Sequence, residues 1–273
     1  MDSIVQTVRP RECLEAEDVQ RRCPICENDD QSRFVVQVNQ GKPGMTQLGR
    51  HEVFMCKVCR FLHNPGNVEK DLNEIDHTSG RVGREDKPGR EYAFAARALE
   101  ILRPKRPLDA LVFGPGVSLD HAHIGDHPSV ASSSVADIRN YQGLDNFLDI
   151  RAGNPDQRKF DLVIASEVIE HFEDPVGHYG SLLDYVSDDG MCIAGTNFVA
   201  GMPVTRLIYP YTAGHSCMWS EGSIHLATAK HGFKSVIFLS TIGGTRKRII
   251  VSTKSLRLYA KLLTLFERKK VFL

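Results

Sequence analysis

The sequence predicts an α/β protein in which a small cysteine-rich module precedes an open, mostly parallel sheet covered by helices on both faces. Two observations carry this prediction. Two Cys-x-x-Cys pairs lie before residue 60, and from residue 108 onward short apolar runs alternate with turns and helical segments. Continuous apolar runs suit strands that are buried on both faces, and alternation with helices favours parallel pairing. With 273 residues and 41% hydrophobic content, the chain can bury a sizeable core.

The composition narrows the classes of function. The 34 basic and 34 acidic side chains cancel, so no overall field attracts nucleic acid and we expect no nucleic-acid partner. No apolar run reaches the ~18 residues that a membrane-spanning helix needs. The first twenty residues lack the apolar segment of a signal peptide, which leads us to expect a cytoplasmic protein.

The cysteine pairs have the spacing of a four-thiolate zinc site. The two pairs are separated by 29 residues, and the four candidate ligands are Cys23, Cys26, Cys56 and Cys59. Each pair can aim two sulfurs at one tetrahedral ion, while FVVQV (34–38) and HEVFMC (51–56) would form strands between them. Four thiolates leave no open position, so the predicted zinc is structural. The alternatives are disulfides, or pairs that never meet.

The chain is predicted to have four parts. A zinc-ribbon module covers residues 1–65, and a polar stretch over 66–90 reads as a linker or lid. The main α/β domain covers 91–254, and it opens with a helix over 91–102, where apolar residues recur at helical spacing. A basic helix follows over 255–273.

Six apolar runs are expected to be the strands of the main sheet, namely 108–113, 133–138, 160–166, 189–198, 235–240 and 248–254. In open parallel sheets the ligand binds beyond the carboxyl ends of the strands. The site is therefore expected just after these runs.

A glycine turn and an acid indicate a nucleoside cofactor. Gly114 and Gly116 lie in the first turn between strand and helix, where the missing side chains let a ligand approach the backbone. Asp137 ends the second strand, and its carboxylate can accept hydrogen bonds from ribose hydroxyls. A dinucleotide-binding fold would have a third glycine near Ser118. The alternative is a plain tight turn with a surface aspartate.

The segment FDLVIASEVIEHFEDP (160–175) strongly resembles the fourth-strand motif of class I S-adenosylmethionine-dependent methyltransferases. The segments 185–198 and 231–254 resemble that family's next strand and closing antiparallel hairpin, so the resemblance extends over roughly 91–254. It implies a doubly wound, Rossmann-like, mostly parallel seven-stranded sheet with an antiparallel C-terminal hairpin. It also implies S-adenosylmethionine as cofactor.

The resemblance carries cofactor-binding roles to particular residues. Gly114 and Gly116 match the first two glycines of the cofactor loop, and Asp137 matches the acid that binds the ribose. Asp149 matches the position beside the adenine. Ser166 and Glu167 match the strand end beside the methionine part of the cofactor. Two positions depart from the family pattern. Val112 stands where the family usually has an acid, and Pro115 separates the glycines and removes a backbone donor.

A second resemblance, to a smaller group of proteins, concerns the N-terminal part of the chain. CPIC, a long spacer and CKVCRFLHNPG (56–66) resemble the zinc-binding module of a bacterial methyltransferase subgroup that serves polysaccharide, sugar or secondary-metabolite pathways. The segment 214–233 resembles that subgroup's substrate-side loop and helix. The resemblance implies O-methylation of a sugar or glycan hydroxyl, as in surface-polysaccharide or O-antigen biosynthesis. C- or N-methylation of a nucleotide sugar or secondary metabolite, and a cofactor-free scaffold, remain open.

Two histidines are candidates for proton transfer. Methyl transfer to a hydroxyl needs alignment and benefits from a base, and an imidazole suits that proton. His171 and His215 are expected to act as base or orienting group, with Glu167 near the cofactor or the substrate. The alternative is that Glu170 and His171 cap the helix that begins around Asp174.

Two other segments keep more than one interpretation. Tyr209, Tyr211 and Trp219 could form a wall for a sugar or pack their loop. From Arg246 to the end there are nine basic residues and one acid, on an amphipathic segment over 255–270. That helix could make peripheral contact with an anionic membrane or a lipid-linked glycan, mediate a homodimer, or be a solvated helix packed through its leucines.

Overall fold

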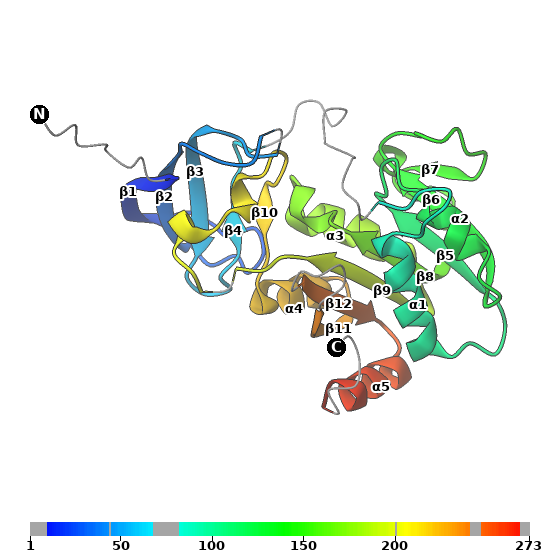
Figure 1. Ribbon diagram of the computed structural model, residues 1–273. Coiled ribbons are helices and arrows are strands. Elements are labelled where there is room, and N and C mark those ends of the chain that lie inside the picture. Colours follow the sequence, from blue (N-terminus) through cyan, green and yellow to red (C-terminus); the bar gives the residue numbers. More distant parts are fainter. Residues whose placement is uncertain (1–9, 44, 68–81, 200, 241–246, 268–273) are drawn as a thin grey trace, which may run out of the picture.

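The computed structural model of the protein describes residues 10–43, 45–67, 82–199, 201–240 and 247–267. Within these residues the chain forms two sheets, a five-stranded sheet in the order β1-β2-β3-β4-β10 and a seven-stranded sheet in the order β11-β12-β9-β8-β5-β6-β7. The small sheet lies beyond one end of the large one, at the left of Figure 1. None of the described helices is long and apolar enough to cross a membrane.

The small sheet is antiparallel and takes one strand from far along the chain. Its strands are β1 (Arg11–Gln20), β2 (Asp30–Val38), β3 (Gly49–Cys56), β4 (Leu62–His63) and β10 (Cys217–Met218). Cys217 pairs with His63 across β10 and β4. The sheet around the cysteines is therefore completed by Cys217–Met218, which belong to the main domain, so the two parts of the chain share one sheet.

The large sheet has a parallel centre and an antiparallel end. Its strands are β5 (Leu108–Phe113), β6 (Val130–Asp137), β7 (Phe147–Asp149), β8 (Phe160–Ser166), β9 (Val186–Thr196), β11 (Lys234–Ser240) and β12 (Lys247–Thr253). β5, β6, β7, β8 and β9 pair in parallel. β12 lies antiparallel between β9 and β11. This is the seven-stranded Rossmann-like sheet with a closing antiparallel hairpin that the sequence predicted, and the fold class is confirmed.

Helices cover both faces of the large sheet, as Figure 1 shows. The helices are α1 (Arg90–Leu102), α2 (Asp120–Gly125), α3 (Pro175–Leu183), α4 (Glu221–Lys230) and α5 (Leu256–Glu267), with short 3-10 turns at Ile150–Ala152, Ile169–His171, Val204–Arg206 and Tyr209–Tyr211. One buried cluster contains residues of α1, α2 and α5, and the other contains residues of α3 and α4. The apolar runs are continuous because both faces of the strands are covered.

The second of these clusters also contains the cysteine module. Cys23, Cys56 and Phe61 are buried together with Tyr179 of α3 and Trp219. The Trp219 ring lies edge-on to Phe61, with 5.1 Å between ring centroids. Burying a ring of about 200 Å² contributes on the order of 5 kcal/mol as an upper estimate. The module therefore shares its core with the main domain.

Helix α5 packs through part of its apolar surface. Leu258 and Leu262 are buried, while Leu256 and Phe266 are exposed. Leucine packing thus accounts for one side of the helix. Membrane contact and a homodimer stay predictions.

The strand predicted over 189–198 begins earlier than expected, and part of the predicted linker is not described. β9 begins at Val186, so the polar residues Asp188 and Asp189 lie inside the strand. The register of β8 with β9 jumps from Phe160–Val186 to Leu162–Met191, so the extra residues are accommodated as an irregularity within the strand. Of the predicted linker or lid over 66–90, residues 68–81 lie outside the described residues.

Candidate active site and metal centre

The order of the strands predicts where a ligand binds along the carboxyl edge of the large sheet. From β5 the chain runs outward to β6 and β7 and then returns to β8, which pairs with the other side of β5. Ligands of open α/β sheets bind at this reversal, outside the carboxyl ends of the strands. Gly114 follows β5, Asp137 ends β6, and Glu167 follows β8. Three of the predicted site residues are therefore brought to this edge.

The turn after β5 requires its glycines. Gly114 and Gly116 have φ of +66° and +59°, in the left-handed region. A Cβ on Gly114 would also lie 2.8 Å from Cγ2 of Val168. The Gly116 N–H donates to Oδ2 of Asp137 at 2.9 Å, and the Ile138 N–H donates to Oδ1 at 2.6 Å. A carboxylate has about four acceptor sites, so these bonds are compatible with a further role on ribose.

A buried acid that sequence reasoning missed reaches the same turn from α1. The Ser118 hydroxyl donates to Oε2 of Glu91 at 3.1 Å. Burial is the main cause that raises the pKa of Glu91 to about 7. Val112, at the position where the family has its acid, is buried in the core on the α1 side of the sheet. Glu91 therefore supplies a carboxylate beside the glycine turn, but this residue comes from α1 and not from β5, where the family has its acid.

Asp149 lies next to Asp137 in register, because β7 pairs in parallel with β6. Its carboxylate is held by Arg151, which donates through Nε to Oδ1 at 2.9 Å and through Nη2 to Oδ2 at 2.6 Å. The side chain is 37% exposed. The structure therefore places Asp149 beside the ribose-binding candidate, in an ion pair of its own. Its role beside the adenine stays a prediction.

Three buried oxygens at the end of β8 and just after it have no hydrogen-bond partner among the described residues. They are Ser166 Oγ, Glu167 Oε1 and Glu170 Oε2. An unsatisfied buried polar atom costs about 1–3 kcal/mol, so three within five residues indicate a place for a polar ligand. Glu167 also has φ of +58°, a conformation that costs a non-glycine residue about 1–2 kcal/mol.

The Tyr209 hydroxyl contacts both Glu167 and Glu170. It donates to Oε1 of Glu170 in a close contact and lies 3.1 Å from Oε2 of Glu167. Lys247 forms an ion pair with the same Glu167 oxygen. Burial is the first cause that raises the pKa of Tyr209 well above its ordinary value, so the phenol remains a donor. Sequence reasoning weighed Tyr209 only for stacking or packing, and it did not consider Lys247.

The other two aromatic residues of this loop have packing roles. Trp219 is fully buried, and its Nε1 donates to the Ile169 carbonyl at 3.0 Å. Tyr211 is also fully buried, and its hydroxyl donates to the Val204 carbonyl at 3.1 Å. A sugar cannot stack on buried rings, so the stacking alternative is wrong for both.

His171 and His215 are brought together, although they come from different segments. Their rings are perpendicular, with centroids 4.8 Å apart. Nδ1 of His171 lies 3.0 Å from the Gly214 carbonyl, and Nδ1 of His215 lies 2.8 Å from the Tyr209 carbonyl. A carbonyl only accepts, so each Nδ1 carries a proton and the neutral ring keeps its lone pair on Nε2. Burial lowers the pKa of His215 to about 3.

The capping alternative for Glu170 and His171 is wrong. Both residues lie in a 3-10 turn before α3. The cap of α3 is Asp174, whose Oδ1 accepts from the Gly177 N–H at 3.0 Å, and Pro175 occupies the first turn. Glu170 and His171 are therefore available for another role.

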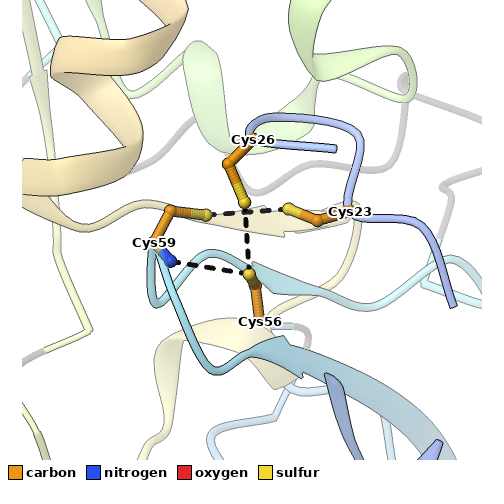
Figure 2. A group of neighbouring side chains, drawn as sticks. All are labelled: Cys23, Cys26, Cys56 and Cys59. Carbon is orange, nitrogen blue, oxygen red and sulfur yellow. Dashed lines mark hydrogen bonds between the residues drawn. The ribbon is translucent and has the colours of Figure 1, made fainter. Parts of the chain in front are cut away.

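The four cysteines converge as the spacing predicted (Figure 2). The Sγ atoms of Cys23 and Cys59 are 3.6 Å apart, and those of Cys26 and Cys56 are 3.4 Å apart. A disulfide requires about 2.05 Å, so the disulfide alternative is wrong. A tetrahedron with bonds of about 2.3 Å to zinc has edges of about 3.8 Å. A hydrogen bond from Cys59 lowers the pKa of the Cys23 thiol to about 5. The cluster is compatible with zinc.

The cysteine module also fastens the loop that carries His215. The Asn67 Nδ2 donates to the carbonyls of Thr212 and His215 at 2.7 Å and 3.1 Å. The Asn64 Nδ2 donates to the Pro210 carbonyl at 2.8 Å. Asn64 and Asn67 are both fully buried. The position of His215 at the sheet edge therefore depends on residues just after the second cysteine pair.

Neither a protein-family model nor a curated protein matches the sequence. Among solved structures, a Burkholderia thailandensis 1,6-didemethyltoxoflavin-N1-methyltransferase with bound S-adenosylhomocysteine is similar with a TM-score of 0.47 and 14% identity over 60% of this chain and 78% of that one. A Synechocystis PCC 6803 magnesium protoporphyrin IX methyltransferase has a TM-score of 0.44 and 16% identity over 61% of this chain and 84% of that one. A glycopeptide N-methyltransferase has a TM-score of 0.44 and 11% identity over 60% of this chain and 90% of that one. Values of this size assign neither an activity nor a binding residue to this chain.

Proposed function

We propose that the protein is an S-adenosylmethionine-dependent methyltransferase that modifies a hydroxyl of a sugar or glycan of the surface-polysaccharide type. One observation carries the cofactor assignment. The glycine turn, Asp137 and two oxygens of Ser166 and Glu167 that have no partner among the described residues lie at the reversal of a sheet that ends in an antiparallel hairpin. A dinucleotide-binding sheet would instead continue in parallel and have a third glycine near Ser118.

The residues at this edge fit the parts of the cofactor. Asp137 would accept hydrogen bonds from the ribose, and the backbone at Gly114 and Gly116 allows close approach. Ser166 Oγ and Glu167 Oε1 would accept from the ammonium of the methionine part, which satisfies two buried oxygens. When bound, S-adenosylmethionine supplies a methyl group on a sulfonium sulfur, which keeps the electron pair of the broken C–S bond.

The chain's own contribution to the reaction is to orient the acceptor and accept its proton. His171 is our candidate base, because its Nδ1 proton is held by Gly214 and its lone pair on Nε2 can accept the hydroxyl proton. His215 is too weak a base, since burial lowers its pKa to about 3. We therefore assign His215 an orienting role beside His171.

We further propose that Cys23, Cys26, Cys56 and Cys59 hold a structural zinc ion. The sulfur separations and the burial of the cluster support this assignment. Four thiolates fill the tetrahedron, so no position remains for a substrate.

Calorimetric titration of zinc-loaded protein with S-adenosylmethionine and S-adenosylhomocysteine tests the cofactor assignment. We expect micromolar binding that is weakened at least about 30-fold in Asp137→Ala, because charge-assisted hydrogen bonds contribute about 1.5–3 kcal/mol each. The matched control is Asp145→Ala, an exposed acid on the connection after β6, which should bind like the wild type. Absence of heat with either ligand at millimolar concentration would instead support the cofactor-free scaffold.

Transfer of an isotope-labelled methyl group to a panel of acceptors tests the acceptor class. The panel contains nucleotide sugars, oligosaccharides and small aromatic amines, and mass spectrometry of the products locates the label. We expect the label on a sugar oxygen. A label on nitrogen or carbon would keep the methyltransferase assignment and replace the O-methylation proposal.

A further inference from the structure

Three side chains at the edge of the sheet form a ligand set distinct from the cysteines. Glu170, His171 and His215 each offer one ligating atom, and these atoms all lie within 4.8 Å of one another. Glu170 is completely buried, and its Oε2 has no partner among the described residues. With Nδ1 of each imidazole donating to a carbonyl, Nε2 of each is the nitrogen that can bind a cation.

Each of the three groups is held in orientation by its other polar atom. The Tyr209 hydroxyl donates to Oε1 of Glu170, and the Tyr209 carbonyl accepts from Nδ1 of His215. The Gly214 carbonyl accepts from Nδ1 of His171. Metal-binding histidines usually donate their second N–H in this way, which sets the tautomer and the ring orientation. The arrangement therefore has an inner set of donors and a second set that positions them.

Glu170 forms no ion pair in the part of the chain that the structure describes, whereas Glu167 is paired with Lys247. Arg90 forms its ion pair with Glu91 and acts on Glu170 only through longer-range attraction. A buried carboxylate without a counterion is costly. A cation bound at Oε2 would remove both the unmatched charge and the unsatisfied oxygen.

We propose that Glu170, His171 and His215 bind one divalent transition-metal ion, which leaves a coordination position for a further ligand. Two imidazoles and one carboxylate suit zinc or iron(II) better than magnesium or calcium, which prefer oxygen ligands. Tetrahedral bonds of about 2.1 Å require ligand separations of about 3.4 Å. This separation lies within the 4.8 Å that bounds the distances between the three donors.

The metal ion gives the open position a role in the proposed reaction. A hydroxyl bound there loses its proton more readily, as water does on a catalytic zinc ion. The ion would occupy the Nε2 lone pair of His171, so His171 could not act as the base at the same time. The ion would then favour the deprotonated acceptor in its place, and the proton would leave to solvent. Metal binding itself does not require the cofactor, so it is independent of the proposed methyl transfer.

Metal titration of the full chain with its cysteine site loaded with Zn²⁺ tests the proposal. The probe is Co²⁺, followed by its visible absorption, and total metal is measured by mass spectrometry after dialysis. The test variants are Glu170→Gln and His171→Asn. The matched control is His178→Gln, an exposed histidine in the same segment. Zinc retained at the cysteines and an unchanged circular dichroism spectrum serve as the reference for folding in every variant.

We expect the wild type and His178→Gln to bind one Co²⁺ per chain in addition to the cysteine-bound zinc, without the absorption of cobalt–thiolate bonds. Binding should weaken at least about tenfold in both test variants. The proposal is overturned if the wild type binds no second ion at millimolar Co²⁺, or if the folded variants bind it as tightly as the wild type. A second ion without S-adenosylmethionine binding would leave this proposal standing and remove the methyltransferase assignment, whereas the reverse result would do the opposite.

Discussion

The cysteine cluster and the Glu170–His171–His215 cluster are both buried ligand sets, but they differ in the number and origin of their donors. The cysteine cluster has four sulfurs from two tight turns and lies in the core that Phe61 and Trp219 also fill. The other cluster has three donors, two from the turn after β8 and one from the loop before α4, at the carboxyl edge of the sheet. Four donors close a tetrahedron, whereas three leave a position for a substrate.

The four-cysteine cluster, a closed site, can hold in place the loop that carries a ligand of the three-donor cluster, an open site. The carbonyls of Pro210, Thr212 and His215 accept hydrogen bonds from Asn64 and Asn67, which follow the second cysteine pair. The Ser220 hydroxyl donates to the Cys59 carbonyl at 2.5 Å. The cysteine turn and the loop with His215 are thus joined by hydrogen bonds. Loss of the closed site should therefore disrupt the open one, while the reverse should not occur.

Cys56→Ser should have the largest effect. Structural zinc sites contribute about 10–16 kcal/mol of binding free energy to folding, which is comparable to the whole stability of a domain. We expect loss of zinc, unfolding of the small sheet and loss of methyl transfer, as measured by metal analysis, circular dichroism and activity. Cys13→Ser is the control, because Cys13 is exposed on β1 and outside the cluster. A folded, active Cys56→Ser protein would contradict the structural role of the site.

Asn67→Ala tests the connection between the two sites. Its side chain donates to three loop carbonyls, and losing these hydrogen bonds at about 0.5–1.5 kcal/mol each costs about 2–4 kcal/mol in total. We expect zinc to be retained while methyl transfer falls, with a lower free energy of unfolding in urea. Asn146→Ala removes a single exposed hydrogen bond and should change little. If Asn67→Ala keeps full activity, the loop does not depend on the module.

Glu91 provides a buried carboxylate outside both ligand sets. Its pKa is raised by burial from 4.5 to about 7, so the folded protein holds this proton more tightly than the unfolded chain does. The corresponding stability is fully present below pH 4.5 and is lost as the pH rises through 7, by roughly 3 kcal/mol in total. We expect Glu91→Gln to reduce the fall in the free energy of unfolding between pH 5 and pH 8. An unchanged pH profile would mean that Glu91 is not protonated in the folded state.

Tyr209→Phe should have the smallest effect on stability. The change removes the hydroxyl that contacts Glu170 and Glu167 but keeps the carbonyl that orients His215. We expect a loss of about 1–2 kcal/mol in stability and a 10–100-fold lower kcat, with unchanged affinity for S-adenosylhomocysteine. Tyr259→Phe, on α5 and outside the site, is the control. A weaker cofactor affinity with unchanged kcat would place Tyr209 in the cofactor site instead.

Sequence patterns predicted the central strands well and the peripheral ones poorly. The bounds of β5 and β8 agree with the predicted runs 108–113 and 160–166, because continuous apolar residues there are bounded by turn formers. β1 was missed because most of its residues are exposed and five of the ten are charged, so no apolar alternation marks it. β10 was missed because its two residues are ordered only by pairing with β4.

The sequence by itself determined the α/β fold class, the cysteine cluster and the turn with Gly114 and Gly116, because these depend on local spacing and on apolar runs. Only the tertiary structure decided which other groups surround His171. His215 and Tyr209 reach it through a loop held by Asn64 and Asn67, and Glu91 reaches the glycine turn from α1. Such contacts depend on how distant segments pack and on which buried polar atoms pair, and no local pattern of residues encodes that pairing.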